Sequence, residues 1–571
     1  MKNKNYRFYD LISHASNAHK LIQSLHFDKT VIASFLIIYY LLTIFNAAIE
    51  GICMLLLVNI ITQFSSGISP NIFEFPKYII QILTIVGLKA DISNVVYFLT
   101  VFFGLNLITR LTLLIFDGLL VARLRQRLQE TLFKRFLFGE WSTTRDYRLG
   151  DAVGTNTQEA STVAKYLTSA INAFYFLLSA LVMILMAIIA GPQIIFFLAL
   201  VGFPFVIIMN NIFSSQSQLS KKSALLRNQF SADITDRFNG LLQVHTDSNY
   251  EYHINKGLQA QETLTKIDIK IGFCQALIGS FNILLPFFVM TSFSLWVYFM
   301  GSENIQGLSA LGSVGILSFR AASQLNGAIA SFGNLSRLSG SLFPVLSMLA
   351  IKPVNKRTLI QEEIIGIELN RVSYRYGIHK VLNNINLSVT KGFPLLLTGR
   401  SGKGKTTIGN LIAGLFYPSS GELMYKGASG KSYLSSKYRA NIGFVTQDIY
   451  LFQGTLRSNL IGNKKYTDKE IWSVLKQVDI FNFVKKIGGL ETQTAEAGRS
   501  LSGGQRRRLG IARALLSGCD ILIFDEILSG LDKKNKIAIT KLINELSYRK
   551  ILIMISHDKI FLNKKFNYNI E

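Results

Sequence analysis

Charged residues are scarce in this sequence. Asp, Glu, Lys and Arg together make up 17% of its 571 residues, whereas hydrophobic residues make up 49%. An average soluble domain carries roughly 25% charged residues, so this shortage excludes an ordinary soluble protein over the whole length. A chain of this length is also too long for one hydrophobic core, and at least two domains are expected.

Cysteine and acidic residues are also few. Cys53, Cys274 and Cys519 lie far apart without metal-ligand spacing, which excludes a disulfide framework and a cysteine-based zinc site. Lys and Arg number 60 against 35 for Asp and Glu, a formal net charge of +25. We interpret this excess as basic cytoplasmic loops of a membrane protein. Because no basic nucleic-acid module accompanies it, no nucleic-acid partner is expected.

Long apolar runs recur in the first 350 residues. A membrane-spanning helix needs about 20 apolar residues. Basic segments follow the second and fourth runs, which places these segments and the N-terminus on the cytoplasmic side. No apolar core with a cleavage site precedes the first run, so no signal peptide is expected. The six predicted spans are residues 31–61, 95–121, 166–190, 194–213, 271–300 and 305–323.

The composition changes near residues 351–360, where Pro353 interrupts the helical pattern and Lys and Glu replace the apolar runs. From about residue 365, short strands, turns and helices alternate, as in a soluble α/β domain. The prediction is therefore an all-α transmembrane domain with six helices and cytoplasmic extensions over 1–350, a linker over 351–364, and an α/β domain over 365–571.

A buried strand at residues 395–398 runs into a glycine-rich segment with the pattern G-x-x-x-x-G-K-[ST]. Its glycines let backbone N–H groups close around phosphate oxygens, and a following helix start favours negative charge. Lys405 is expected to reach the β- and γ-phosphates of ATP, and Thr406 to bind Mg²⁺. The predicted ATP-binding residues here are Gly399, Arg400, Ser401, Gly402, Lys403, Gly404, Lys405, Thr406 and Thr407.

Two further segments suit the same chemistry. Residues 521–526 form an apolar strand ending in Asp525 and Glu526. Such acids also end strands at solvated turns, but beside a phosphate loop Asp525 suits a Mg²⁺ ligand and Glu526 a base that polarises the attacking water. The second segment is either an ordinary turn or an anion site at a helix start. It comprises Leu501, Ser502, Gly503, Gly504 and Gln505.

The phosphate loop, Leu-Ser-Gly-Gly-Gln and Ile-Leu-Ile-Phe-Asp-Glu, in that order, resemble the ATP-binding cassette (ABC) family. Six spans before one such P-loop ATPase domain are similar to the layout of exporter half-transporters. The resemblance implies a homodimer, with ATP and Mg²⁺ between one copy's phosphate loop and the other copy's residues 501–505. It also implies transport-coupled ATP hydrolysis by a translocase in a bacterial inner membrane, with the ATPase domain in the cytoplasm.

The resemblance assigns further residues. Tyr376 matches the aromatic that stacks on adenine, although a strand aromatic in the core is the plainer reading. Gln447 matches the glutamine that senses Mg²⁺ and the membrane domain, so the expected metal residues are Thr406, Gln447 and Asp525. Residues 529–532 match the loop between paired cassettes, and His557 matches the histidine that contacts the γ-phosphate.

Segments 155–160 and 245–252 are expected to contact the cassettes, the alternative being exposed helix bends. Four charges lie within apolar spans, where burial is costly and often functional. They either line the substrate path or pair with one another internally. These residues are Glu50, Arg110, Asp117 and Arg320.

Ala48-Ile49-Glu50-Gly51, together with Arg110, is similar to exporters that flip lipid-linked oligosaccharides or other glycolipids. The predicted function is export of an amphipathic or lipid-linked substrate from the cytoplasmic side outward by alternating access. Export of a small peptide, such as a microcin-type antimicrobial, is the alternative. An ATP-gated channel or a membrane sensor is disfavoured, because gating by nucleotide binding does not need Glu526 and His557.

Overall fold

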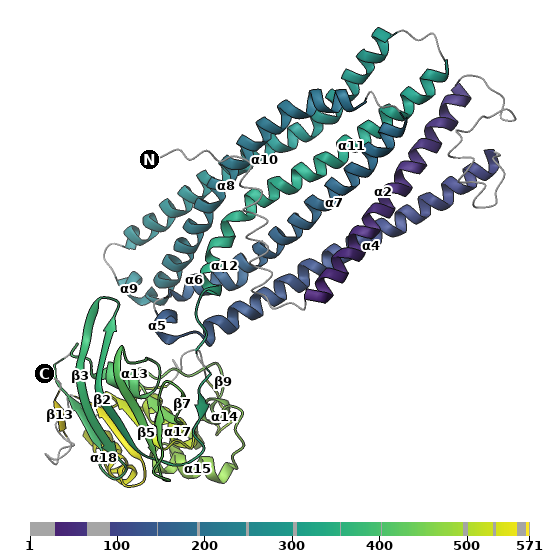
Figure 1. The fold of residues 1–571 in the computed structure, drawn as a ribbon. Helices are drawn as coiled ribbons and strands as arrows, with labels where there is room; N and C mark the ends of the chain where they lie inside the picture. The colour runs from purple at the N-terminus through teal and green to yellow at the C-terminus, as the bar shows by residue number, and fades with distance from the viewer. Residues whose placement is uncertain are drawn as a thin grey trace. The chain divides into compact units, whose positions relative to one another are not determined.

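The computed structural model describes residues 29–65, 92–145, 147–190, 194–246, 250–300, 305–354, 356–400, 402–494, 501–528, 533–556 and 567–569. The chain divides into two compact units (Figure 1). The first comprises Met1–Gly139 and Thr144–Lys352, and the second Glu140–Thr143 and Pro353–Glu571. The first unit is helical, and the second carries all the described strands.

Each of the six apolar runs lies within one long helix of the first unit. These helices are α2 (Lys29–Ser65), α4 (Ile92–Leu137), α7 (Ala160–Ala190), α8 (Ile194–Asn239), α10 (Tyr250–Met300) and α11 (Ile305–Leu338). The shorter elements of this unit are α6 (Leu149–Gly154), the π-helical turn η2 (Thr155–Glu159), α9 (Leu241–Thr246), the 3₁₀ turn η3 (Ser339–Ser341) and α12 (Leu342–Leu349). The short helix α5 (Trp141–Thr144) belongs to the second unit except for its last residue.

Three described segments are long and apolar enough to cross a membrane: Ser34–Met54, Ser93–Leu137 and Leu149–Ile188. The other three predicted runs fall in α8, α10 and α11, where many side chains of the apolar parts lie outside the described ones. The first unit is therefore a helical membrane domain. The count of six spans stays a prediction.

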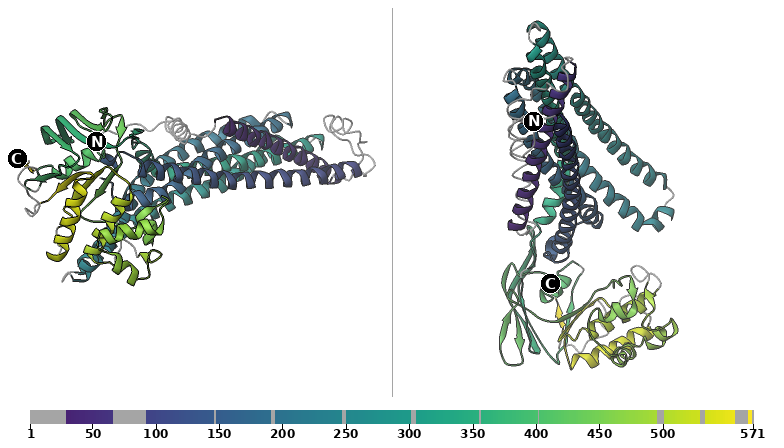
Figure 2. Two further views of the ribbon diagram at one scale, coloured as in Figure 1. Left: turned by 90° about the horizontal axis from the view of Figure 1, so that it is seen from below. Right: turned by 90° about the vertical axis from the view of Figure 1, so that its right-hand side faces the viewer.

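Large apolar side chains remain exposed along α4. Phe103 is 68% exposed, Ile108 62% and Leu114 63%. An apolar surface of this extent is rare on a soluble monomer and suits a lipid environment or a partner chain. Beyond its apolar run, α8 continues as a polar extension that packs beside α10 (Figures 1 and 2). The short helix α9 lies between α8 and α10 along the chain and contacts both.

The segment 155–160 is the first of the two segments expected to contact a cassette. It forms η2 and the first residue of α7, and three of its six residues are buried within the helical unit. Thr155 is 4% exposed, Glu159 3% and Ala160 0%. Thr157 and Gln158 between them are exposed, so contact of this segment with a cassette stays a prediction. In segment 245–252, residues 247–249 lie outside the described residues, so its contact with a cassette stays a prediction.

The second unit is built on a parallel sheet of five strands in the order β13-β4-β12-β11-β8. Beside it lies an antiparallel sheet in the order β3-β2-β5-β6. The parallel strands are β4 (Leu395–Thr398), β8 (Ile442–Val445), β11 (Ile521–Asp525), β12 (Ile551–Ile555) and β13 (Asn567–Asn569). The antiparallel ones are β2 (Ile364–Tyr376), β3 (His379–Thr390), β5 (Ser420–Gly427) and β6 (Ser432–Leu434).

Two short strand pairs and six further helices complete the described part of this unit. The pairs are β1 (Thr358–Leu359) with β7 (Tyr438–Arg439), and β9 (Gly454–Thr455) with β10 (Gln493–Thr494). The helices are α13 (Lys405–Ile412), α14 (Leu456–Ile461), α15 (Asp468–Gln477), α16 (Phe481–Lys486), α17 (Gly503–Leu516) and α18 (Lys533–Ser547).

The central strands are apolar on both faces. All five residues of β12 are buried, as are the first four of β11. Continuous apolar strands of this kind belong in a parallel sheet covered on both sides. Accordingly, alternate residues divide between two hydrophobic cores: Leu522 and Leu552 join one, and Ile523 and Ile553 the other.

Truncation of a central strand residue is expected to destabilise the cassette. Leu552 is 0% exposed, and Leu552→Ala should lower the free energy of unfolding by about 2–5 kcal/mol, because it leaves a cavity between packed layers. Ile537→Ala is the control, since Ile537 on α18 is 62% exposed and should cost no more than about 0.5 kcal/mol. Calorimetry of the detergent-solubilised chain measures both, and equal melting temperatures would contradict the packing.

Candidate nucleotide-binding site

The candidate site lies where the carboxyl ends of the parallel strands meet. The phosphate loop follows β4, Gln447 comes shortly after β8, Asp525 ends β11 and Glu526 follows it directly. The register aligns these ends: Asp525 pairs with Ile555 on β12, and Ile555 pairs with Leu397 on β4. Since ligands of open α/β sheets bind outside this edge, the fold gathers the predicted groups from distant parts of the sequence.

The phosphate loop depends on glycine at its last turn. Gly404 caps α13 with φ +94° and ψ +11°, in the left-handed region, where a side chain is strained. A Cβ at this position would also lie 2.7 Å from Leu382 Cδ2 on β3. The tight turn directs the first N–H groups of α13 toward the loop, as an anion site requires.

Lys405 begins α13 and is buried, with 6% of its surface exposed. Its Nζ donates hydrogen bonds to the carbonyl oxygens of Gly399, at 2.7 Å, and Arg400, at 2.9 Å. The ammonium group therefore lies across the loop that would hold phosphates. Arg400 and Lys403 are exposed on the same loop, so the loop carries three positive charges together with Lys405.

Thr406 and Asp525 lie together. The Thr406 hydroxyl donates a hydrogen bond to the Asp525 carboxylate. Burial raises the pKa of the Asp525 carboxyl above its usual range, and the negative charge of Glu526 raises it further, against the opposing hydrogen bond from Thr406. A carboxylate and a hydroxyl in contact form a partial coordination shell for a hard cation.

Glu526 has an unusual backbone. Its φ is +49°, in the left-handed region that a non-glycine residue enters at a cost. Its N–H donates to the carbonyl oxygen of Ile555 at 2.9 Å. The strand ladder thus extends one residue beyond β11 before the chain turns, which fixes the position of the Glu526 backbone beside Asp525.

Tyr376 lies at the end of β2, and its hydroxyl is 3.3 Å from Thr407 Oγ1 on α13. Its ring meets Tyr374 and Phe416 edge to face, with centroid distances of 4.9 and 5.6 Å. The ring is thus half-buried in an aromatic cluster beside the phosphate loop. This placement is compatible with both readings of Tyr376, as a core aromatic and as a platform for adenine.

The segment from Leu501 to Gln505 forms the start of α17. Ser502 is the N-cap: its hydroxyl accepts from the Gln505 N–H at 3.3 Å, and Gln505 Oε1 accepts from the Ser502 N–H at 2.9 Å. This reciprocal pair is a capping box. Leu501 is 8% exposed in the core, whereas Gly503 and Gly504 present backbone N–H groups in the first turn. The segment therefore has both a structural role and an open helix terminus.

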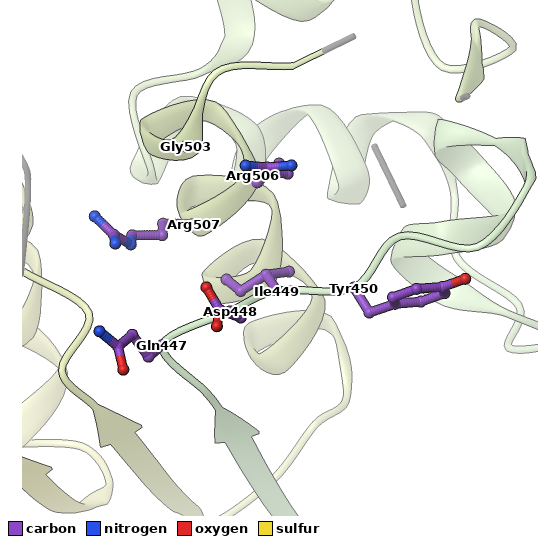
Figure 3. Close-up of a pocket in the computed structure, with 7 residues that line it drawn as sticks. All are labelled: Gln447, Asp448, Ile449, Tyr450, Gly503, Arg506 and Arg507. Atoms are coloured by element: carbon purple, nitrogen blue, oxygen red, sulfur yellow. The ribbon is translucent and has the colours of Figure 1, made fainter. Parts of the chain in front are cut away.

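Gln447 lines a cleft of about 240 Å³ together with Asp448, Ile449, Tyr450, Gly503, Arg506 and Arg507. Figure 3 shows Gln447 and Asp448 on the segment after β8, Arg507 across from them on α17, and the Tyr450 ring directed away. Sequence reasoning missed Arg506 and Arg507. The run of three arginines directly after Gln505 is the signal that could have indicated them.

Arg513 fixes the wall of this cleft. Its Nε donates to the Asn459 carbonyl oxygen at 2.8 Å, and its Nη1 donates to the Tyr450 carbonyl oxygen at 3.1 Å. In turn, Asn459 Oδ1 accepts a hydrogen bond from the Phe452 N–H, and Asn459 Nδ2 donates one to the Phe452 carbonyl oxygen, each at 2.8 Å. One polar network thereby joins α14, α17 and the chain after Gln447.

Of the predicted site residues, Ser401, the loop 529–532 and His557 lie outside the described residues.

The four charges of the apolar spans behave differently from one another. Glu50 on α2 forms an ion pair with Arg320 on α11. Asn172 Nδ2 on α7 donates to Asp117 Oδ2 on α4 at 3.2 Å. Arg110 is exposed on α4. Of the two alternatives for these charges, a substrate path or internal ion pairing, Glu50 and Arg320 show internal ion pairing.

Comparison with known proteins agrees with this geometry. Residues 382–529 match the family model described as ABC transporter. The chain is 40% identical over 195 residues to an uncharacterized ABC transporter ATP-binding protein of Bacillus subtilis, covering 34% of each chain. It is 39% identical over 197 residues to an ATP-dependent lipid A-core flippase of Haemophilus influenzae, again covering 34% of each. The matched part thus spans about a third of these curated relatives.

The whole fold is similar to that of a solved structure, a bacterial Atm1-family ABC exporter with ATP bound. The TM-score is 0.77 at 16% identity, over 95% of this chain and 94% of that one. These findings define the class by resemblance: residues 382–529 match the ABC transporter model, and the chain as a whole has the fold of an ABC exporter, in which a helical membrane domain is joined to a cassette. This confirms the predicted resemblance and the order of a helical membrane domain followed by an α/β cassette, and the matched family model implies ATP binding by the cassette.

Neutralising Asp525 should stabilise the nucleotide-free protein while impairing hydrolysis. Because burial raises the folded-state pKa of Asp525, the folded state binds more protons than the unfolded state between the two pKa values. Stability therefore falls as the pH rises through that window. The Asp525→Asn variant has no buried charge and therefore lacks this destabilisation. Its side-chain oxygen still accepts the hydrogen bond from the Thr406 hydroxyl. Thermal unfolding at pH 5 and pH 8 checks this, and a lower melting temperature for Asp525→Asn at pH 8 would contradict it.

Proposed function

We propose that this protein is an ATP-driven exporter that moves an amphipathic or lipid-linked substrate, such as a glycolipid or an oligosaccharide-lipid, outward across the bacterial inner membrane. The observation that carries the proposal is the common sheet edge at which the phosphate loop, Asp525 and Glu526 meet. Hydrolysis of ATP at this edge supplies the free energy for transport.

Mg²⁺ is the proposed metal cofactor. The Thr406 hydroxyl in contact with the Asp525 carboxylate is the kind of small oxygen set that Mg²⁺ shares with substrate phosphates and water. Gln447, after the neighbouring strand β8, is the proposed sensor of this site. Among the described residues no group of three His, Cys, Asp or Glu side chains gathers, which suits an ion held partly by phosphates.

Each residue then has a proposed task. Lys405 moves from the loop carbonyls to the β- and γ-phosphates, and the N–H groups of α13 hold the remaining phosphate oxygens. Glu526 polarises the attacking water. Tyr376 stacks on adenine, and His557 contacts the γ-phosphate.

A second copy of the chain is the proposed partner. Electrostatic stabilisation of phosphoryl transfer requires donors on all sides of the triphosphate, whereas the phosphate loop encloses it from one side. The start of α17, with Ser502, Gly503 and Gly504, supplies the missing anion site from the partner copy. A homodimer with two equal sites follows, since both required surfaces are present in one chain.

Support for a lipid substrate comes from relatives described as lipid A-core flippases and from the exposed apolar surface of α4. In the proposed path, Arg110 and Asp117 face the substrate, whereas the ion pair assigns Glu50 and Arg320 to holding α2 against α11. Peptide export is the alternative. ATPase assays in liposomes with added lipid-linked sugars or peptides discriminate the two, and stimulation by peptides alone would contradict the lipid proposal.

Removing the proposed base should stop turnover without loss of ATP binding. Glu526→Gln keeps the shape of the side chain but cannot accept a proton, so the ATPase rate should fall by about 100- to 10,000-fold. Labelled ATP should still bind with wild-type affinity. Glu491→Gln, an exposed acid that pairs with Arg457, serves as the control. Turnover at the wild-type rate in Glu526→Gln would contradict the assigned role.

Two substitutions at Ser502 separate helix capping from phosphate binding. Ser502→Ala loses the cap and should cost about 0.5–2 kcal/mol. Ser502→Asp keeps a good cap but brings a negative charge toward the partner's phosphates, so its stability should match the wild type while ATPase activity is lost. Melting temperature and ATPase rate are measured for both. Full activity in Ser502→Asp would assign the segment a purely structural role.

A further inference from the structure

Two helical irregularities meet in the first unit. The chain from α6 to α7 passes through the π-helical turn η2, and the chain from α11 to α12 passes through the 3₁₀ turn η3. Glu159, the last residue of η2, is 3% exposed and hydrogen-bonded to Ser341, the last residue of η3. Short π and 3₁₀ segments within longer helices frequently mark hinges and functional sites.

α8 crosses η3 at very short range. A Cβ on Gly340 would lie 2.3 Å from the Ser220 carbonyl oxygen, so only glycine permits this approach. The Gly340 N–H donates to Ser220 Oγ at 3.2 Å, and Ser217 Oγ is 3.0 Å from Ser339 Oγ. Small residues and hydroxyls thus replace the interlocking apolar side chains of an ordinary helix crossing.

The crossing is buried yet polar. Ser217, Ser220, Ser339 and Ser341 are each 4–7% exposed. One turn from Ser220, Gln216 is 0% exposed, and among the described residues neither its amide nitrogen nor its amide oxygen has a hydrogen-bond partner. Leaving a buried amide without hydrogen-bond partners destabilises this arrangement. A second arrangement of this crossing, in which Gln216 gains a partner, would relieve that destabilisation.

We infer that Glu159, the η3 turn, and Ser217 and Ser220 on α8 form a polar joint on which α12 changes its packing during each transport cycle. α12 leads directly along the chain to the cassette, and its neighbours include η2, α4 and α7. Interlocked apolar cores resist sliding, whereas hydroxyl pairs can exchange partners over short shifts. The joint gives the membrane domain two packings and transmits nucleotide-driven movement; this inference rests on the proposed function.

A reversible disulfide tests the joint. Cys53, Cys274 and Cys519 are free and buried, and they are first replaced by Ala. Ser217→Cys and Ser339→Cys are then introduced, at hydroxyl positions 3.0 Å apart, which suits a disulfide. The protein is reconstituted in liposomes of phosphatidylethanolamine and phosphatidylglycerol, and its ATPase rate is measured after oxidation and again after dithiothreitol.

The oxidised joint should lower the ATPase rate about fivefold or more, and reduction should restore it. Ser223→Cys with Asp268→Cys is the matched control. It links α8 to α10, where Ser223 Oγ and Asp268 Oδ1 are 3.0 Å apart, and should leave the rate within about twofold of the reduced form.

The inference would be overturned if the Ser217→Cys, Ser339→Cys variant kept full ATPase activity after complete oxidation. Equal inhibition by the disulfide of the control variant would also overturn it. Failure of the two cysteines to form a disulfide would contradict the close crossing itself. These results differ from a failure of the proposed function, in which the wild type and the reduced variants alike hydrolyse no ATP.

Discussion

The parallel pairing of β4, β12, β11 and β8 is the constraint on which the cassette depends. Parallel strands end at one edge, so a phosphate loop, an acid pair and a glutamine separated by as many as 127 positions (399 to 526) become neighbours. The apolar faces of β11 and β12 are buried on both sides, which fixes the register. A slip of one residue would turn Asp525 away from Thr406.

In the membrane domain the corresponding constraint is that buried polar groups need partners. Glu50 pairs with Arg320, and Thr109 Oγ1 on α4 donates to Asn46 Oδ1 on α2 at 2.6 Å. A lone charge in a lipid environment is costly, so these pairs hold α2 against α4 and α11. Polar pairing thereby specifies which helices meet, a task that apolar contact with equally apolar lipid performs poorly.

Much of this architecture could be predicted from the sequence. The phosphate loop, the order of the motifs and the apolar runs are local patterns, and the structure carries each of them on the expected kind of element. Other features depend on contacts between distant residues. The Glu50–Arg320 pair joins positions 270 residues apart, and the burial of Glu159 depends on η3, 180 positions later (159 to 339). The left-handed backbone of Glu526 and its hydrogen bond to Ile555, 29 positions later (526 to 555), are likewise not indicated by any local pattern.

The central claim is that each ATP lies between two copies of the chain. Lys405→Ala and Ser502→Asp variants, each inactive alone, can be mixed and reassembled into dimers. If the sites are shared between copies, a mixed dimer carries both lesions at one site and leaves the other intact, so ATPase activity returns. If each chain completes its own site, no mixture regains activity above that of the separate variants, and the account is contradicted.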